Sequence, residues 1–142
     1  MSELGKSDGH RSGSQSRQRA IRVERVVCAH DCGQIINPDG LVKCIEGNIV
    51  QGVSRTLWEE VRFDNKNVTS VDWQTYPILD ITETPERIDF VLINHPELPP
   101  TGAGEPSTRP VAAAIANAIF DATGVRIRRV PFSPDRVKQS LS

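Results

Sequence analysis

Apolar residues recur at every fourth position between residues 41 and 57, and this spacing constrains the fold more than any other feature of the chain. The members of this stripe are Leu41, Ile45, Ile49, Val53 and Leu57. Such spacing puts them on one face of an α-helix, and that face must be covered by another element. Asn37 or Asp39, on either side of Pro38, can cap the start. The predicted helix ends near Glu60.

Two more helices are predicted towards the C-terminus. Residues 111–123 are rich in alanine, with Val111, Ile115 and Ile119 on one face, and Gly124 suits the end of that helix. Residues 134–141 predict a short closing helix.

Strands are predicted from β-branched and apolar runs at 21–28, 88–93 and 125–130, and from a hairpin over 61–71 with its turn at 64–67. The run at 88–93 is apolar on both faces towards its end, which indicates a central strand. This order of elements predicts an α+β fold in which a mixed sheet packs against two main helices. Residues 1–19 contain one aliphatic side chain, Leu4, and we expect a disordered tail there. One domain then spans residues 20–142.

Composition excludes several classes of function. The 17 basic and 18 acidic residues nearly cancel, so nucleic acid is not an expected partner, and Arg126, Arg128 and Arg129 are interpreted as a solvated strand face. No apolar run approaches the roughly 20 residues of a membrane span. Three cysteines without a readable signal peptide indicate free thiols. We therefore expect a cytoplasmic location, with export as part of a larger complex as the alternative.

The loop over residues 95–110 is the strongest candidate for chemistry. It holds five prolines and two glycines, and Glu105 lies in it just before the predicted helix at 111–123. Prolines stiffen such a loop, and a fixed, ionised carboxylate is what a general base needs. The alternative is a glutamate that only completes the capping of the next helix.

Two other stretches allow two interpretations each. Cys28, His30 and Cys32 share one face of a strand, but a metal site needs a fourth ligand and His95 is isolated, so buried thiols and a hydrogen-bonded histidine are favoured over zinc or iron. Gly47 and Gly52 each cost a helix interior about 1 kcal/mol relative to alanine. They indicate close approach by a cofactor, or close packing by another helix.

Four segments in a fixed order resemble the molybdenum hydroxylases, the xanthine dehydrogenase and aldehyde oxidase family. They are Asp-Cys-Gly-Gln-Ile-Ile-Asn-Pro at 31–38, Ile-Glu-Gly-Asn-Ile-Val-Gln-Gly at 45–52, Trp-Glu-Glu at 58–60 and Gly-Ala-Gly-Glu-Pro at 102–106. The resemblance covers residues 23–141. It is closest to the bacterial branch with separate molybdopterin-binding large subunits, which includes isoquinoline 1-oxidoreductase-like proteins.

The resemblance implies hydroxylation of an aldehyde or an N-heterocycle with oxygen from water at a molybdopterin-type molybdenum cofactor. Carried over, Glu105 is the general base that takes a proton from the metal-bound hydroxyl, and Gly104 shapes the pocket. The family usually places a glutamine amide against the cofactor where this chain has Cys44, and a thiol is only a weak hydrogen-bond donor. Gln51 and Gly52 complete the predicted cofactor-binding residues.

The family's large subunit has several hundred residues, so residues 20–142 are expected to be a C-terminal fragment of its molybdopterin-binding domain. The implied partners are the remainder of the large subunit, a [2Fe–2S] small subunit and a small-molecule substrate, and no iron–sulfur cluster is expected in this chain. We expect no activity without the upstream portion, and exposed apolar helix faces where that portion would lie. The alternative is a non-catalytic truncated remnant, or a docking piece that associates with an intact hydroxylase.

Overall fold

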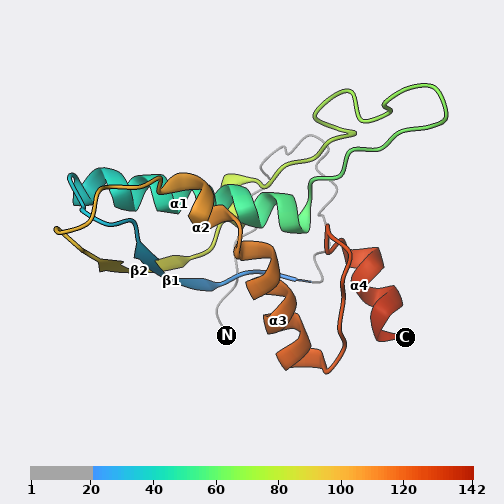
Figure 1. Ribbon diagram of the computed structural model, residues 1–142. Coiled ribbons are helices and arrows are strands. Elements are labelled where there is room, and N and C mark those ends of the chain that lie inside the picture. The colour runs from blue at the N-terminus through green and yellow to red at the C-terminus, as the bar shows by residue number, and fades with distance from the viewer. Residues whose placement is uncertain (1–20) are drawn as a thin grey trace, which may run out of the picture.

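The computed structural model describes residues 21–142, so the tail predicted at 1–19 lies outside the described residues. Their element order is β1 (Arg25–Asp31), α1 (Pro38–Leu57), the 3-10 turn η1 (Ile81–Glu83), β2 (Arg87–Ile93), α2 (Gly104–Thr108), α3 (Val111–Thr123) and α4 (Pro134–Leu141). Figure 1 shows the long α1 along one side of the two strands, with the short α2 beside it and α3 running away from it. The predicted α+β class with two main helices is confirmed.

Helix α1 forms where its spacing and its cap predict it. The Asn37 side chain accepts a hydrogen bond from Gly40 N at 2.9 Å, so Asn37 is the cap. Ile45, Ile49 and Val53 are the most deeply buried large side chains of the described residues. The apolar stripe is therefore the centre of the core.

The sheet in residues 21–142 has two parallel strands, β1 and β2. Val26, Cys28 and His30 pair in register with Ile88, Phe90 and Leu92, which puts these alternate side chains on the face towards the core. On the outer face Val91 and Ile93 are 53% and 40% exposed. The predicted central position of residues 88–93 is thus wrong within the described chain, because β2 pairs on one side only.

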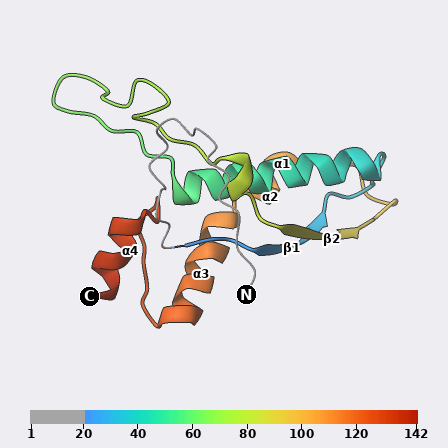
Figure 2. The same ribbon diagram turned by 180° about the vertical axis from the view of Figure 1, so that it is seen from behind.

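Residues 61–71 form the predicted turn but not the two predicted strands. Asp64 Oδ1 accepts hydrogen bonds from the backbone of Lys66 and Asn67, at 2.7 and 2.8 Å. Beyond the turn there is a single antiparallel bridge, between Phe63 and Val68. Residues 61–69 are all exposed, and a two-stranded ribbon with no covered face is marginal in water. The segment projects away from α1 in both views (Figures 1 and 2).

The predicted strand at 125–130 is also wrong. Ile127 and Phe132 are buried, and Phe132 N donates to Thr56 O at 2.8 Å near the end of α1. Arg126 turns back over α3, with its guanidinium carbon 3.7 Å from the centre of the Phe120 ring. The segment is held by isolated contacts, because no strand edge in residues 21–142 pairs with it.

Helix α4 is fastened to the end of α1 by a cluster of charges. Arg136 donates to Glu60 Oε1 at 2.9 Å, and Arg62 and Arg129 each lie 3.7 Å from the same carboxylate. The hydrogen bond from Arg136, with the charges of the three arginines, holds the pKa of Glu60 below its ordinary value despite the opposing desolvation. Val137 of α4 is buried in the core.

Large apolar side chains are exposed mainly on the sheet and the loops rather than on helix faces. The projecting segment is defined as residues 61–73, and its Phe63, Val71 and Trp73 are 76%, 75% and 75% exposed. The expectation of exposed helix faces is therefore corrected, since α1 and α3 cover each other. No helix within residues 21–142 is both long enough and apolar enough to cross a membrane.

Candidate functional site

Glu105 is the second residue of α2, so the expected loop is interrupted by one helical turn. Pro106 suits this position because a proline in the first turn lacks only an N–H that the helix does not use. Ser107 Oγ donates to Gly104 O at 2.6 Å, and Arg109 N donates to Glu105 O at 3.2 Å. These bonds give Glu105 a defined backbone position.

The Glu105 carboxylate points into solvent. Its side chain is 87% exposed, and its ion pair with Arg109, at 3.4 Å, joins two exposed groups four residues apart. Such a pair contributes about 0.3–0.5 kcal/mol and exchanges readily with water. The carboxylate is therefore free to meet a ligand or another part of a larger protein.

The start of α2 lies directly on α1, next to Cys44. A methyl group built on Gly104 would lie 3.0 Å from Asn48 Nδ2 and 3.4 Å from Cys44 Sγ. Two predicted site residues that are 60 positions apart in the sequence, Cys44 and Gly104, are thus brought together. Cys44 is exposed, while Gly102 has open space where a side chain would be.

Gln51 and Gly52 have different environments. Gln51 is exposed and follows Cys44 by seven residues, about two helical turns, so both project from the same side of α1. Gly52 is buried, and a methyl group built on it would lie 2.9 Å from Val111 Cβ. Gly52 therefore serves the packing of α1 against α3, and its role as a cofactor-binding residue stays a prediction. Gly47 has nothing within 4 Å of its missing side chain.

In the cysteine and histidine stretch, two of the three side chains are buried and Cys28 is half-buried. Cys32 and His30 are each 5% exposed, all three cysteines are free, and burial raises the pKa of the Cys28 thiol. Nε2 of His30 has no hydrogen-bond partner among residues 21–142. Within the same residues no group of three acidic, cysteine or histidine side chains is arranged to hold a metal ion. The predicted free thiols are confirmed.

The sequence suggested that His95 is isolated, but in the structure it has two acidic neighbours. Its ring lies between two carboxylates, with Nε2 3.4 Å from Asp31 and Nδ1 2.9 Å from Glu97. Gly33 accepts a hydrogen bond from His95 N at 3.1 Å, and Thr101 N donates to Cys32 O at 2.8 Å. These bonds fasten the loop after β2, which leads to Gly104, to the end of β1.

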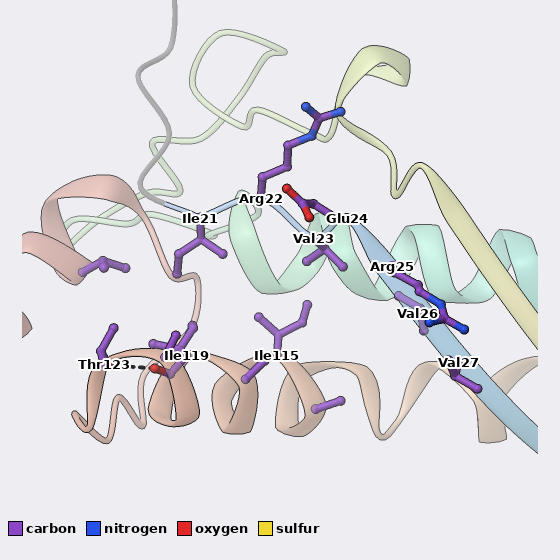
Figure 3. A pocket seen from close by; sticks show the side chains of 14 residues that line it. Ile21, Arg22, Val23, Glu24, Arg25, Val26, Val27, Ile115, Ile119 and Thr123 are labelled. Atoms are coloured by element: carbon purple, nitrogen blue, oxygen red, sulfur yellow. Dashed lines mark hydrogen bonds between the residues drawn. The ribbon is translucent and has the colours of Figure 1, made fainter.

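A groove of about 620 Å³ lies elsewhere, between residues 21–27 and α3. Figure 3 shows Ile21 and Val23 facing Ile115 and Ile119 across it. None of the predicted site residues lines this groove. The candidate site is therefore the junction of α1 and α2, which is an open surface.

Comparisons with known proteins bear on what this junction is. Residues 16–85 match the sequence profile of the molybdopterin cofactor-binding domain. A nicotinate dehydrogenase subunit of Pseudomonas putida is 46% identical over 125 residues, which are 88% of this chain and 10% of that protein. The chain belongs to the molybdenum hydroxylase family.

Other relatives extend the comparison. The beta subunit of isoquinoline 1-oxidoreductase from Brevundimonas diminuta is 29% identical over 82% of this chain and 15% of its own length. The expected isoquinoline branch is therefore one of several. The crystal structure of quinoline 2-oxidoreductase from Pseudomonas putida 86 aligns with a TM-score of 0.75 and 29% identity over 84% of this chain and 16% of that chain. This chain spans less than a fifth of each of these molybdenum hydroxylase subunits.

The α1–α2 junction fits one wall of a molybdopterin site. A cofactor of this kind offers many polar atoms, and the junction presents an exposed amide at Gln51, a close backbone at Gly104 and open space at Gly102. Cys44 would give such a wall a thiol at the position where the family was expected to have an amide. Asn48, which the sequence did not single out, lies between Cys44 and Gly104, and its place four residues after Cys44 was the available signal.

Proposed function

We propose that residues 21–142 supply one wall of the cofactor site in a molybdenum hydroxylase and carry its general base, Glu105. The observation that supports this is the position of α2: its exposed glutamate stands beside the side of α1 from which Cys44 and Gln51 project. Gly104, which precedes Glu105, lies against Cys44 on α1, so the backbone of the proposed base starts next to the proposed cofactor-binding wall.

The chain's own residues have distinct roles in this proposal. Gln51 would hold polar atoms of the cofactor through its amide, and the Gly104 backbone would approach it closely because no side chain intervenes. Glu105 Oε would take the proton of a water-derived hydroxyl as its oxygen attacks the substrate carbon. When bound, the molybdenum cofactor supplies the acceptor for the two electrons that leave the oxidised carbon.

The reaction needs partners beyond residues 21–142. An open junction must be closed by other protein before it can exclude water from a cofactor and a substrate. We propose that the remainder of the large subunit, on the same polypeptide or on another, does this, and that a [2Fe–2S] subunit removes the electrons. The substrate class is an aldehyde or an N-heterocycle, and the nicotinate dehydrogenase relative makes a pyridine carboxylate the first compound to test.

The test is a reconstituted enzyme. The chain is expressed together with the remainder of the large subunit and the iron–sulfur subunit, and substrate-dependent dye reduction is measured with nicotinate, isoquinoline and an aromatic aldehyde. Glu105→Gln should lower kcat by about 100-fold or more, since general-base catalysis contributes about 10²–10⁴. Molybdenum content should be unchanged. Glu86→Gln, which alters a carboxylate 64% exposed and paired with Arg22, is the matched control and should leave kcat unchanged.

Two outcomes contradict parts of the proposal. Full activity in Glu105→Gln would remove the general-base role. A wild-type complex that contains the cofactor but turns over none of the three compounds would favour a non-catalytic docking piece.

A further inference from the structure

One side chain of α1, Asn48, forms hydrogen bonds through both its amide nitrogen and its amide oxygen, and the second of these bonds reaches α2. Asn48 Nδ2 donates to Cys44 O at 2.8 Å, and Asn48 Oδ1 accepts from Thr108 Oγ1 at 2.9 Å. Rotating the amide by 180° would set its oxygen against the carbonyl of Cys44, so these bonds fix which atom faces Thr108. The Thr108 hydroxyl also lies 3.3 Å from the backbone oxygen of Asn48.

The Asn48 side chain contacts both the first and the last residue of α2. At the start of the helix, the space beside Gly104 is filled by the Asn48 amide, at 3.0 Å from a methyl group built there. At the other end, Thr108 is the last residue of α2 and donates to the Asn48 side chain. Glu105 lies between these two contacts.

A helix as short as α2 cannot hold its own place. Five residues are far below the roughly 12–15 at which an isolated helix becomes stable in water. Its orientation must therefore come from contacts with its neighbours, and α1 is the long helix on which it lies (Figure 1). The Asn48–Thr108 hydrogen bond joins residues 60 positions apart and is part-buried, so water competes with it less than with the exposed Glu105–Arg109 pair.

From this geometry we infer that Asn48 and Thr108 are positioning residues for Glu105. Asn48 belongs to the same face of α1 as Cys44 and Gln51, so its bond to Thr108 sets the carboxylate relative to the cofactor-binding wall. The inference rests on the proposed function of Glu105. Neither side chain need touch substrate or cofactor.

The experiment uses two matched variants. Thr108→Val removes the hydroxyl and keeps the branched shape, whereas Thr108→Ser keeps the hydroxyl. Hydrogen exchange on the purified chain should show the Arg109 amide, which donates to Glu105 O, losing protection about fivefold in Thr108→Val, as loss of one hydrogen bond predicts. Thr108→Ser should resemble the wild type. The Ile49 amide, inside α1, should be unchanged in both.

The same variants are then measured in the reconstituted enzyme. Thr108→Val should lower kcat about tenfold with KM within about twofold, because a misplaced base weakens the chemical step more than substrate binding. Thr108→Ser should restore kcat. Asn48→Ala should lower kcat at least as far as Thr108→Val, because it also removes the bond to Cys44 O. Adding Thr108→Val to Asn48→Ala should lower kcat no further, since the bond between the two side chains is already lost.

The possible failures are distinguishable. Equal loss of protection at Ile49 and Arg109 would overturn the inference, because the bond would then stabilise the whole chain rather than α2. No loss at Arg109 would also overturn it, because the bond would then not stabilise α2 at all. Unchanged kcat in Thr108→Val, with activity abolished in Glu105→Gln, would overturn it and leave the proposed function standing. Full activity in Glu105→Gln would defeat the proposed function, and the positioning role with it, even if the exchange results were as expected.

Discussion

The α-carbon of Gly52, in the second half of α1, lies against the side chain of Val111, the first residue of α3. A methyl group at Gly52 would come within 2.9 Å of both Cβ and Cγ2 of Val111. Real side chains do not approach this closely, so any larger residue at position 52 must push the two helices apart. The contact also holds the start of α3 against α1. Since α2 ends just before α3, this limits where the turn that carries Glu105 can lie.

Gly52→Ala should therefore destabilise the chain by about 1–3 kcal/mol, the usual cost of overpacking a core. Gly47→Ala is the matched control, because it sits in the same helix with nothing within 4 Å. That change should stabilise by up to about 1 kcal/mol through the better helix propensity of alanine. Urea unfolding followed by circular dichroism measures both.

A double variant separates the steric cause from others. If the clash with Val111 is responsible, Val111→Ala should recover part of the loss caused by Gly52→Ala, and the two changes should be less than additive. Strict additivity would mean that Gly52 is required for some reason other than its contact with Val111.

The three thiols should react in a fixed order. Cys44 is exposed, Cys28 is half-buried with its pKa raised by burial, and Cys32 is buried. Since the thiolate is the reactive form, a raised pKa slows alkylation at neutral pH. We expect Cys44 to react with a maleimide at least about tenfold faster than Cys28, and Cys32 to react only on unfolding. Peptide mapping by mass spectrometry gives the three rates, and faster labelling of Cys32 than of Cys44 would contradict the burial of Cys32 just after β1.

The sequence predicted the elements whose causes are local. The apolar stripe of α1 at every fourth residue, the cap at Asn37 and Gly124 at the end of α3, where φ is 72°, need only neighbours in the chain. No strand edge in residues 21–142 pairs with the segment at 125–130, and the two sides of the hairpin have no covered face. Periodicity cannot detect a missing partner, so these predictions failed.

The site shows the same division. Glu105 and Gly104 were predicted from the motif and remain predictions, and the structure places Gly104 beside Cys44. The role of Gly52 in packing could not be read from the sequence, because cofactor approach and helix packing both require a small residue. The bond between Asn48 and Thr108 spans 60 positions and depends on the fold of both helices. A local pattern carries no signal for it.

The projecting segment should make the purified chain associate. Trp73 is 75% exposed and Phe63 is 76% exposed, and exposed apolar clusters of this kind mark contact surfaces. Trp73→Gln should weaken binding of a hydrophobic dye and shift sizing chromatography towards the monomer, with a change in stability of less than about 0.5 kcal/mol. Phe132→Ser, at a position only 3% exposed, is the opposite control and should unfold the chain and increase dye binding. A sharp monomer peak for the wild type, without dye binding, would show that this surface does not associate.

The Glu60 cluster should make the attachment of α4 depend on pH. The pKa of Glu60 is lowered in the folded chain, first by the hydrogen bond from Arg136, so its carboxylate stabilises the fold at any pH above the unfolded value of about 4.3. That contribution is lost as the pH falls through the lower, folded pKa. Glu60→Gln should thus cost about 1 kcal/mol at pH 7, a figure reduced for partial solvent screening because the side chain is 26% exposed. The difference from the wild type should shrink below about pH 4.

Glu46→Gln, which breaks only the exposed pair with Lys43, should change stability by less than about 0.5 kcal/mol at either pH. Thermal unfolding of the three proteins between pH 3 and 7 measures this. A cost for Glu60→Gln that does not vary with pH would mean that its side chain acts by packing rather than by charge.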